Sequence, residues 1–309
     1  MIWLIGAGQI SYEYSRILDK LKINYLIIGR GKKSAKKFKS KKNVSTGGIS
    51  NFLKKKPICT DKAIVCVNVE NLKSATIQLI NYGVKNILLE KPGGINFKEV
   101  RDLSNFARVK RTNVKIAYNR RFYSSVIKAK ELIKKDGGVQ NFNFDFTEWT
   151  HLIKKLKKNK KILKNWFFLN STHVVDLAFY IGGVPIELNS FTKKNSLWNK
   201  CAVIYSGAGK TKSGSIFTYH ANWQSAGRWS IEFLTSKGKY ILCPLEKLFF
   251  QKRGSLELKE IKLNYKIDRN FKPGFYTQVK AFLENTDKNI PTLLEHCSMI
   301  SIYRQIIKR

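Results

Sequence analysis

The sequence predicts an α/β protein with two domains: a doubly wound parallel sheet, then an α+β domain with a large, open, mainly antiparallel sheet. Short apolar strands alternate with amphipathic helices up to residue 118. Longer runs that alternate apolar and polar residues dominate after that point. The length of 309 residues leaves room for two hydrophobic cores.

The first domain, residues 1–118, is expected to join its strands through right-handed helical crossovers. The strands are expected at 1–5, 24–28, 63–67, 87–89 and 114–118, and the helices at 12–22, 50–55, 72–82 and 97–109. The carboxyl ends of parallel strands meet at one edge of the sheet, so ligands should bind there.

The second domain, residues 119–309, is expected to begin with a helix over 124–135. Strands should follow at 139–150, 186–192, 202–206, 214–223, 229–235, 239–243 and 256–263, with a helix at 171–181 among them. Helices at 276–284 and 293–308 close the chain, and the last one is free to pack back on the first domain.

The first strand runs directly into a glycine turn, Gly6-Ala7-Gly8-Gln9-Ile10-Ser11. A glycine turn that opens a helix offers free amide groups and the positive end of the helix dipole, which suit a pyrophosphate. Gly6 allows the tight turn, Gly8 allows close approach of the phosphates, and Ser11 stands where a dinucleotide fingerprint prefers Gly or Ala. An ordinary strand–turn–helix connection is the alternative interpretation.

The second strand ends in Gly29-Arg30-Gly31-Lys32-Lys33-Ser34. An acidic residue at this place, about 20 residues past the glycine turn, would bind the ribose of NAD, whereas a basic loop accepts the 2′-phosphate of NADP. The segment has no Asp or Glu, so Arg30 and Ser34 favour NADP(H) over NAD(H). The alternative is that Arg30 stacks on the adenine of either cofactor.

Two further segments carry candidate chemistry. Glu90-Lys91-Pro92 ends a strand at the ligand edge, where the Lys91 ammonium could stabilise negative charge on a substrate oxygen. His173 lies near the start of a helix with Asp176 three residues later, and a histidine so placed can exchange a proton near neutral pH. The alternatives are a surface lysine and an ordinary histidine at a helix start.

These motifs together resemble the glucose–fructose oxidoreductase, inositol dehydrogenase and MocA (Gfo/Idh/MocA) family over nearly the whole chain. The matching segments are GAGQIS at 6–11, LLEKPGG at 88–94, YNRRF at 118–122 and STHVVDLAFYIGG at 171–183. The resemblance implies an N-terminal Rossmann domain, a nicotinamide cofactor and a sugar, polyol or sugar-nucleotide substrate. It also implies a homo-oligomer formed through the C-terminal sheet.

Carried over position by position, the resemblance makes Lys91 the active-site lysine and His173 the acid–base residue, with Tyr118 and Arg121 lining the site. Many family members have an Asp four residues before the histidine, where this chain has Leu169, and Asn170 follows it. The expected cofactor contacts are Gly6, Ala7, Gly8, Gln9, Ile10, Arg30, Ser34, Asn68, Glu90 and Lys91. The expected substrate contacts are Lys91, Tyr118, Arg121, Asn170 and His173.

The expected function is therefore hydride transfer between a nicotinamide and a sugar-type carbinol or ketone, as in surface-polysaccharide synthesis. A non-catalytic NAD(P) sensor of the same fold is the alternative, supported by Leu169. The net charge of +37 and the basic runs at 32–42 and 154–161 leave open either an anionic substrate or simple solvation of a Lys-rich surface.

Other partners are not expected. The sequence has no zinc-finger spacing, no RNP-like aromatic signature and no disordered basic arm, which argues against nucleic acid. No apolar run approaches the roughly 18 to 20 residues that span a bilayer, and no basic segment precedes the first strand, so we expect a cytoplasmic protein. The five cysteines are scattered and form no CxxC pair, which argues against a metal site.

Overall fold

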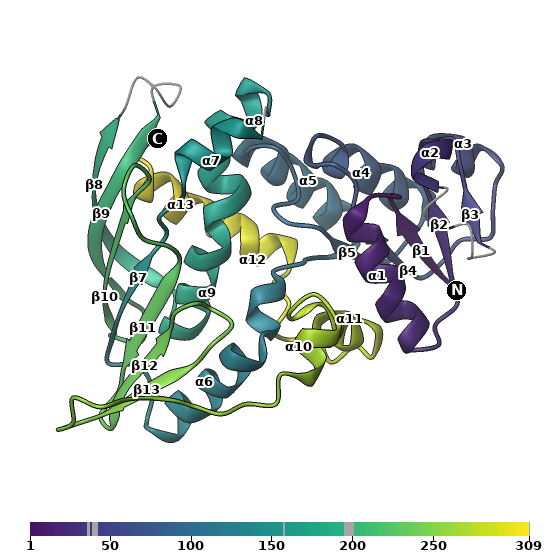
Figure 1. Ribbon diagram of the computed structural model, residues 1–309. Coiled ribbons are helices and arrows are strands. Elements are labelled where there is room, and N and C mark those ends of the chain that lie inside the picture. Colours follow the sequence, from purple (N-terminus) through teal and green to yellow (C-terminus); the bar gives the residue numbers. More distant parts are fainter. Residues whose placement is uncertain (36–37, 39–42, 157, 195–200, 309) are drawn as a thin grey trace. The chain divides into compact units, whose positions relative to one another are not determined.

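The computed structural model describes residues 1–35, 38, 43–156, 158–194 and 201–308 (Figure 1). The chain forms two compact units. The first consists of Met1–Asn119 and Asp268–Ser298, and the second of Arg120–Ile267 and Met299–Arg309. The sequence interpretation assigned all residues after 118 to the second domain. Instead, the segment that returns to the first unit lies before the last helix, and the last helix belongs to the second unit.

The first unit contains a six-stranded, fully parallel sheet with the order β3-β2-β1-β4-β5-β6. Its strands are β1 (Ile2–Ile5), β2 (Tyr25–Ile28), β3 (Val44–Ser45), β4 (Lys62–Val65), β5 (Asn86–Leu89) and β6 (Asn113–Ile116). Its helices are α1 (Gln9–Lys20), α2 (Lys32–Ala35), α3 (Gly48–Lys54), α4 (Leu72–Tyr82), α5 (Phe97–Val109), α11 (Phe275–Leu283) and α12 (Leu293–Ser298). This strand order is that of a dinucleotide-binding Rossmann sheet, as predicted.

The strands of this sheet are apolar on both faces because helices cover both sides. All four residues of β1 are buried, and so are the last three of β4, β5 and β6. In this unit the sequence interpretation missed the short helix α2 and β3, a two-residue strand at the edge of the sheet. Two residues offer too short a pattern to be recognised as a strand.

Two lysines of the sheet bind the segment Asp268–Ser298, by which the chain returns to the first unit. The Lys62 ammonium donates to the backbone carbonyls of Phe282 and Leu283, at 3.2 and 2.6 Å, where α11 ends. Lys115 forms an ion pair with Asp287 at 2.6 Å. The backbone N–H of Ile116 donates to the carbonyl of Pro291, which adds a short bridge at the edge of β6. These contacts join positions more than 150 residues apart, which periodicity along the sequence does not reveal.

The second unit is built on an eight-stranded mixed sheet with the order β14-β13-β12-β11-β7-β10-β9-β8. All of its pairs are antiparallel except β7 with β10. The strands are β7 (Asn141–Asp145), β8 (Pro185–Lys194), β9 (Ala202–Thr211), β10 (Ile216–Asn222), β11 (Ser230–Leu234), β12 (Gly238–Leu242), β13 (Phe249–Lys252) and β14 (Leu258–Glu260). This sheet confirms the predicted α+β class for the second half of the chain.

Aromatic side chains fill the core between this sheet and helix α9 (Thr172–Gly182). The rings of Phe142, Phe144 and Phe217 stack along the inner face, and Phe179 of α9 meets all three edge-on. Such edge-to-face contacts are the favoured geometry for aromatic pairs. The remaining helices of the unit are α6 (Ser124–Lys135), α7 (Thr150–Lys155), α8 (Lys160–Lys164) and α13 (Ile300–Ile306).

Several predicted boundaries in this unit are wrong. The strand expected over 139–150 ends at Asp145, whose carboxylate accepts a hydrogen bond from the backbone N–H of Thr147 at 2.6 Å and turns the chain. The expected helix over 293–308 is two helices, α12 and α13, which belong to different units. The sequence interpretation missed β13, α7, α8 and the short helix α10 (Lys266–Asn270).

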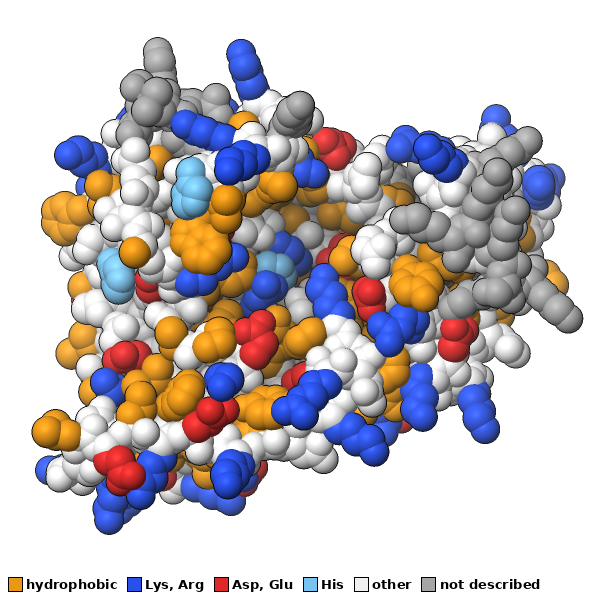
Figure 2. Space-filling model, viewed as in Figure 1, with side chains coloured by type: hydrophobic (Ala, Val, Ile, Leu, Met, Phe, Trp, Pro, Cys, Tyr) orange, Lys and Arg blue, Asp and Glu red, His pale blue; other side chains and the backbone are white. Residues whose placement is uncertain are grey.

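The surface is strongly basic without a single basic patch on the face seen in Figure 2, where blue side chains alternate with red, orange and white ones. Within the described residues no helix is long and apolar enough to cross a membrane. The same residues include no cluster of three or more His, Cys, Asp or Glu that could hold a metal ion.

Candidate functional site

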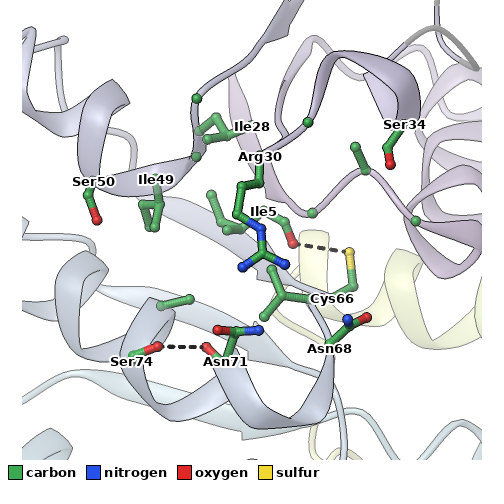
Figure 3. Close-up of a pocket in the computed structure, with 18 of the residues that line it drawn as sticks. Ile5, Ile28, Arg30, Ser34, Ile49, Ser50, Cys66, Asn68, Asn71 and Ser74 are labelled. Carbon is green, nitrogen blue, oxygen red and sulfur yellow. Dashed lines mark hydrogen bonds between the residues drawn. The ribbon is translucent and has the colours of Figure 1, made fainter.

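The first unit has a cavity of about 580 Å³ at the carboxyl edge of its sheet (Figure 3). It lies between the ends of β1, β2 and β4, where Ile5, Ile28 and Cys66 form part of its wall. The strand order reverses between β1 and β4, and open α/β sheets bind ligands at such a switch point. The volume lies within the range of about 300–1,000 Å³ that is usual for ligand pockets.

The glycine turn forms one wall of this cavity. A different physical reason explains why each of its two glycines, Gly6 and Gly8, is a glycine. Gly6 has φ +125°, and a Cβ there would lie 2.8 Å from the carbonyl oxygen of Cys66. Gly8 has extended backbone with open space around the position of its missing Cβ, so a ligand can approach the main chain there. Helix α1 begins directly after Gly8, three residues earlier than the sequence predicted.

Ser11 departs from the fingerprint, but its hydroxyl is satisfied. The side chain is fully buried, accepts a hydrogen bond from the backbone N–H of Gly8 at 3.2 Å and contacts the Cys66 thiol at 3.2 Å. Burial raises the pKa of that thiol strongly, so Cys66 stays neutral. The hydroxyl therefore stabilises the turn.

Arg30 is the cation of the cavity. Its guanidinium projects into the cavity toward Asn71, whereas the Ser34 hydroxyl lies apart from it (Figure 3). Among the described residues that line the cavity none is acidic. A guanidinium, several side-chain amides and hydroxyls, and an open main chain at Gly8 are a donor set that fits the phosphates and ribose of a dinucleotide.

Six of the ten expected cofactor contacts line this cavity: Gly6, Ala7, Gly8, Arg30, Ser34 and Asn68. Gln9, Ile10, Glu90 and Lys91 do not, and their contact with a cofactor stays a prediction. The sequence interpretation missed the opposite wall, formed by Gly47, Gly48, Ile49, Ser50, Asn71, Ser74, Ala75 and Gln78. The sequence marks part of this wall with the glycine pair Gly47-Gly48. In the structure these two residues adopt φ +93° and +82°.

Lys91 follows β5 in a segment that two side chains of the same unit hold. The Tyr14 hydroxyl donates to the Glu90 carboxylate at 2.7 Å, and His296 Nε2 donates to the Pro92 carbonyl at 3.1 Å. Burial raises the pKa of Glu90, while Tyr14, Lys272 and Lys91 oppose that shift. The lysine backbone is thus fixed on both sides by residues from α1 and α12, which the sequence interpretation did not assign to the site.

His173 is a buried residue of the second unit, in the first turn of α9. A turn of π-helix over Phe167–Ser171 precedes it, and such turns are frequent at functional sites. The imidazole ring lies 6.0 Å from the ring of Trp229, which precedes β11.

Glu148 provides a carboxylate beside the residues that precede His173. Its side chain accepts hydrogen bonds from Asn170 Nδ2 at 2.9 and 3.1 Å and from Ser171 Oγ at 2.9 Å, and it pairs with Arg228 at 3.1 Å. Burial raises its pKa, while Arg228, Ser171 and Asn170 oppose that shift. The chain therefore has an acid near this helix start although Leu169 replaces the expected Asp, and only folding brings it there from the segment after β7.

Asp176 and Arg121 form an ion pair with each other. The Arg121 guanidinium binds the Asp176 carboxylate through Nε at 2.8 Å and Nη2 at 2.6 Å and lies over the Tyr180 ring. Tyr118 is fully buried in the first unit, with its ring 5.4 Å from that of His296. Substrate contacts by Arg121, Tyr118 and Asn170 stay predictions.

No family model and no curated protein sequence matches this chain. Solved structures do match over the full length. The chain is similar to a dehydrogenase (MviM) from Clostridium difficile, with a TM-score of 0.77 and 18% identity over 99% of this chain and 98% of that one. An oxidoreductase from Agrobacterium radiobacter in complex with NAD+, L-tartaric acid and magnesium matches at TM-score 0.77 and 12% identity, over 98% and 94%. UDP-N-acetylglucosamine 3-dehydrogenase GnnA from Acidithiobacillus ferrooxidans matches at TM-score 0.74 and 11% identity, over 99% and 96%. These similarities confirm the predicted two-part fold.

Proposed function

We propose that this protein is an NAD(P)-dependent oxidoreductase of the Gfo/Idh/MocA type, acting on a CH–OH or ketone group of a sugar, polyol or sugar nucleotide. The main support is the cavity at the switch point of the Rossmann sheet. Its main chain is open at Gly8, and the Arg30 guanidinium lies inside it. The similar folds of a structure with NAD+ bound and of a sugar-nucleotide dehydrogenase support this proposal.

A bound nicotinamide would supply the hydride chemistry, and residues of the chain would handle the oxygen and the proton. Lys91 would hold the substrate oxygen and lower the pKa of its hydroxyl through its positive charge. His173 would accept that proton on oxidation and return it on reduction. Gly6, Gly8 and the start of α1 would orient the cofactor through its pyrophosphate.

We propose NADP(H) as the preferred cofactor. Arg30 is exposed toward the cavity, and none of the described lining residues is an acid that would repel a 2′-phosphate. Charge-assisted hydrogen bonds from a guanidinium to phosphate are among the stronger polar contacts in proteins.

Two further expectations accompany this function. We propose a homo-oligomer formed through the large sheet, because Ile186, Phe191 and Ile216 expose apolar side chains along β8 and β10. We also propose a cytoplasmic location, which agrees with the absence of a disulfide bond among the five described cysteines.

The test compares cofactor binding with turnover. Calorimetric titration with NADP+ and NAD+ should give binding of at least one, and a panel of sugars, polyols and sugar nucleotides should give reduced nicotinamide with at least one. Lys91→Met and His173→Ala should each lower kcat by about 10²-fold or more, as expected for loss of oxyanion stabilisation or of acid–base catalysis.

Matched substitutions control this test. Lys110→Met, at an exposed lysine after α5, and His220→Ala, at an exposed histidine of β10, should leave turnover unchanged. Unchanged turnover in Lys91→Met or His173→Ala would show that the roles assigned here are wrong. Tight cofactor binding without turnover on the whole panel would favour a non-catalytic sensor instead.

A further inference from the structure

We propose that the substrate carries an oxyanion, a phosphate or a carboxylate, that binds between Arg120 and Arg228 beside Trp229. This inference rests on the proposed oxidoreductase function and names the chemical class of its substrate. It concerns residues of the second unit only, so it stands on geometry separate from the cofactor cavity.

The first reason is a cation without a carboxylate. No Asp or Glu oxygen lies within ion-pair distance of the Arg120 guanidinium among the residues that the structure describes. The guanidinium contacts aromatic faces instead, 4.7 Å from the Trp229 ring centroid and 6.0 Å from that of Tyr123. A partly buried charge with no counter-ion is costly in a folded protein, and an anionic ligand would offset that cost.

Electrostatics agree with this geometry. Burial lowers the pKa of Arg120, the positive charge of Arg228 lowers it further, and Glu246 and Glu148 oppose the shift. Arg120 nevertheless stays protonated, because a guanidinium is not deprotonated in proteins. The site therefore holds two guanidinium groups with two carboxylates nearby. Glu148 already binds Arg228, and Glu246 forms no ion pair with a described residue.

Arg228 and Trp229 complete the proposed anion site, and neighbouring side chains hold the Arg228 guanidinium in position. The Arg228 guanidinium lies 4.7 Å from the Trp229 ring centroid and 5.1 Å from that of Trp149, and Glu148 binds it through Nη1. Its side chain is still 47% exposed, so donors remain accessible to a ligand. The Trp229 indole N–H is buried and has no acceptor among the described residues, which leaves a further donor at the same ring.

Sheet topology explains why these residues meet. Strands β7 and β10 run parallel and β11 pairs antiparallel with β7, so the ends of β7 and β10 lie at the same edge as the start of β11. Glu148 and Trp149 follow β7, whereas Arg228 and Trp229 precede β11. The indole N–H of Trp149 donates to the Gly227 carbonyl at 2.8 Å and joins the two loops.

The position relative to His173 makes this a substrate site. Trp229 contacts Arg120 and Arg228 and lies 6.0 Å from the His173 ring. A substrate whose reacting hydroxyl met His173 would thus place an anionic substituent, a few bonds away, at the arginine pair. The described lysines of 154–161 are exposed side chains on or between α7 and α8 and form no comparable contacts with tryptophan rings.

The experiment measures binding rather than turnover, with the full-length protein saturated with NADP+. Calorimetry compares D-glucose 6-phosphate, D-glucuronate and UDP-glucose with neutral D-glucose. At least one anionic probe should bind at least about tenfold more tightly than D-glucose, and the arm that does so distinguishes phosphate, carboxylate and diphosphate. Arg120→Gln and Arg228→Gln should each weaken that probe about 10- to 100-fold and leave D-glucose unchanged.

Arg253→Gln, at an exposed arginine of the same unit, is the matched control and should have no effect. If Arg120→Gln does not fold, Arg228→Gln at the more exposed position and Arg120→Lys, which keeps the charge, carry the test. Equal binding of D-glucose and every anionic probe, or unchanged anion binding in the folded Gln variants, overturns the proposal. Absence of NADP+ binding or of turnover contradicts the oxidoreductase function alone, because an anion preference that Arg120→Gln removes is measured separately.

Discussion

At the scale of single residues, the role of an arginine depends on whether a neighbouring carboxylate binds its guanidinium. Arg30, Arg120 and Arg121 are all arginines close to strand ends or sheet edges, yet only Arg121 is fully paired, by Asp176. Arg30 lines a cavity whose described walls contain no acid, and Arg120 contacts aromatic rings. The paired residue stabilises the fold, and the other two are available to ligands.

Replacing Arg30 tests the cofactor preference. Arg30→Gln should weaken NADP+ binding about 10- to 100-fold, because a charge-assisted hydrogen bond to the 2′-phosphate is lost, and change NAD+ binding little. Calorimetric titration with both cofactors measures the difference. Lys33→Gln, at a neighbouring exposed lysine of α2, is the control. An equal loss for both cofactors would mean that Arg30 stacks on the adenine.

At the scale of elements, the glycine turn between β1 and α1 contains one glycine that the fold requires and, two residues later, one that it does not. Gly6 adopts φ +125° and lies against the main chain of Cys66, so the fold requires a glycine there. Gly8 adopts an ordinary extended backbone and faces open space. The fold therefore does not require glycine at position 8, and the proposed cofactor would account for it.

Paired alanine substitutions test this separation. Gly6→Ala should lower the free energy of unfolding by about 1–3 kcal/mol, since it forces a strained backbone and a clash with the Cys66 carbonyl. Gly8→Ala should leave that free energy nearly unchanged and weaken cofactor binding, because its methyl group occupies the phosphate position. Urea unfolding and calorimetric titration measure the two effects. Equal destabilisation by both substitutions would contradict this account.

At the scale of the whole molecule, charge is the dominant property. The chain carries 58 basic and 21 acidic residues. Most of the described ion pairs have at least one exposed partner, and exposed pairs contribute little to stability. Such an excess of positive charge favours the unfolded state through self-repulsion. It would also attract anionic ligands to the two proposed sites, over a range set by ionic strength.

Moderate salt should therefore stabilise the protein. Raising NaCl from about 0.1 to 1 M shortens the screening length from about 10 to 3 Å, so the melting temperature should rise. Differential scanning calorimetry measures it. The triple variant Lys154→Glu, Lys155→Glu and Lys158→Glu should show a smaller rise because it carries less excess charge. A melting temperature that falls with salt would mean that ion pairs outweigh repulsion.

The sequence by itself determined the Rossmann sheet, the glycine turn and the helix that carries His173. Each depends on a local pattern: apolar runs of a few residues, positive-φ glycines and the 3.6-residue period of α5 and α6, whose bounds were predicted without error. A short window of the chain contains each of these patterns, although the packing that stabilises the sheet is long-range.

Tertiary structure alone decided what those residues contact. The return of Asp268–Ser298 to the first unit depends on Lys62 and Lys115 meeting partners more than 150 residues away. Glu148 and Trp149 meet Arg228 because β7 and β11 are neighbours in one sheet, whereas Arg120 reaches Trp229 from the segment after β6. Strand order is set by packing of the whole core, and for that reason the glycine turn was predictable from the sequence and the contacts of Arg120 and Arg228 with Trp229 were not.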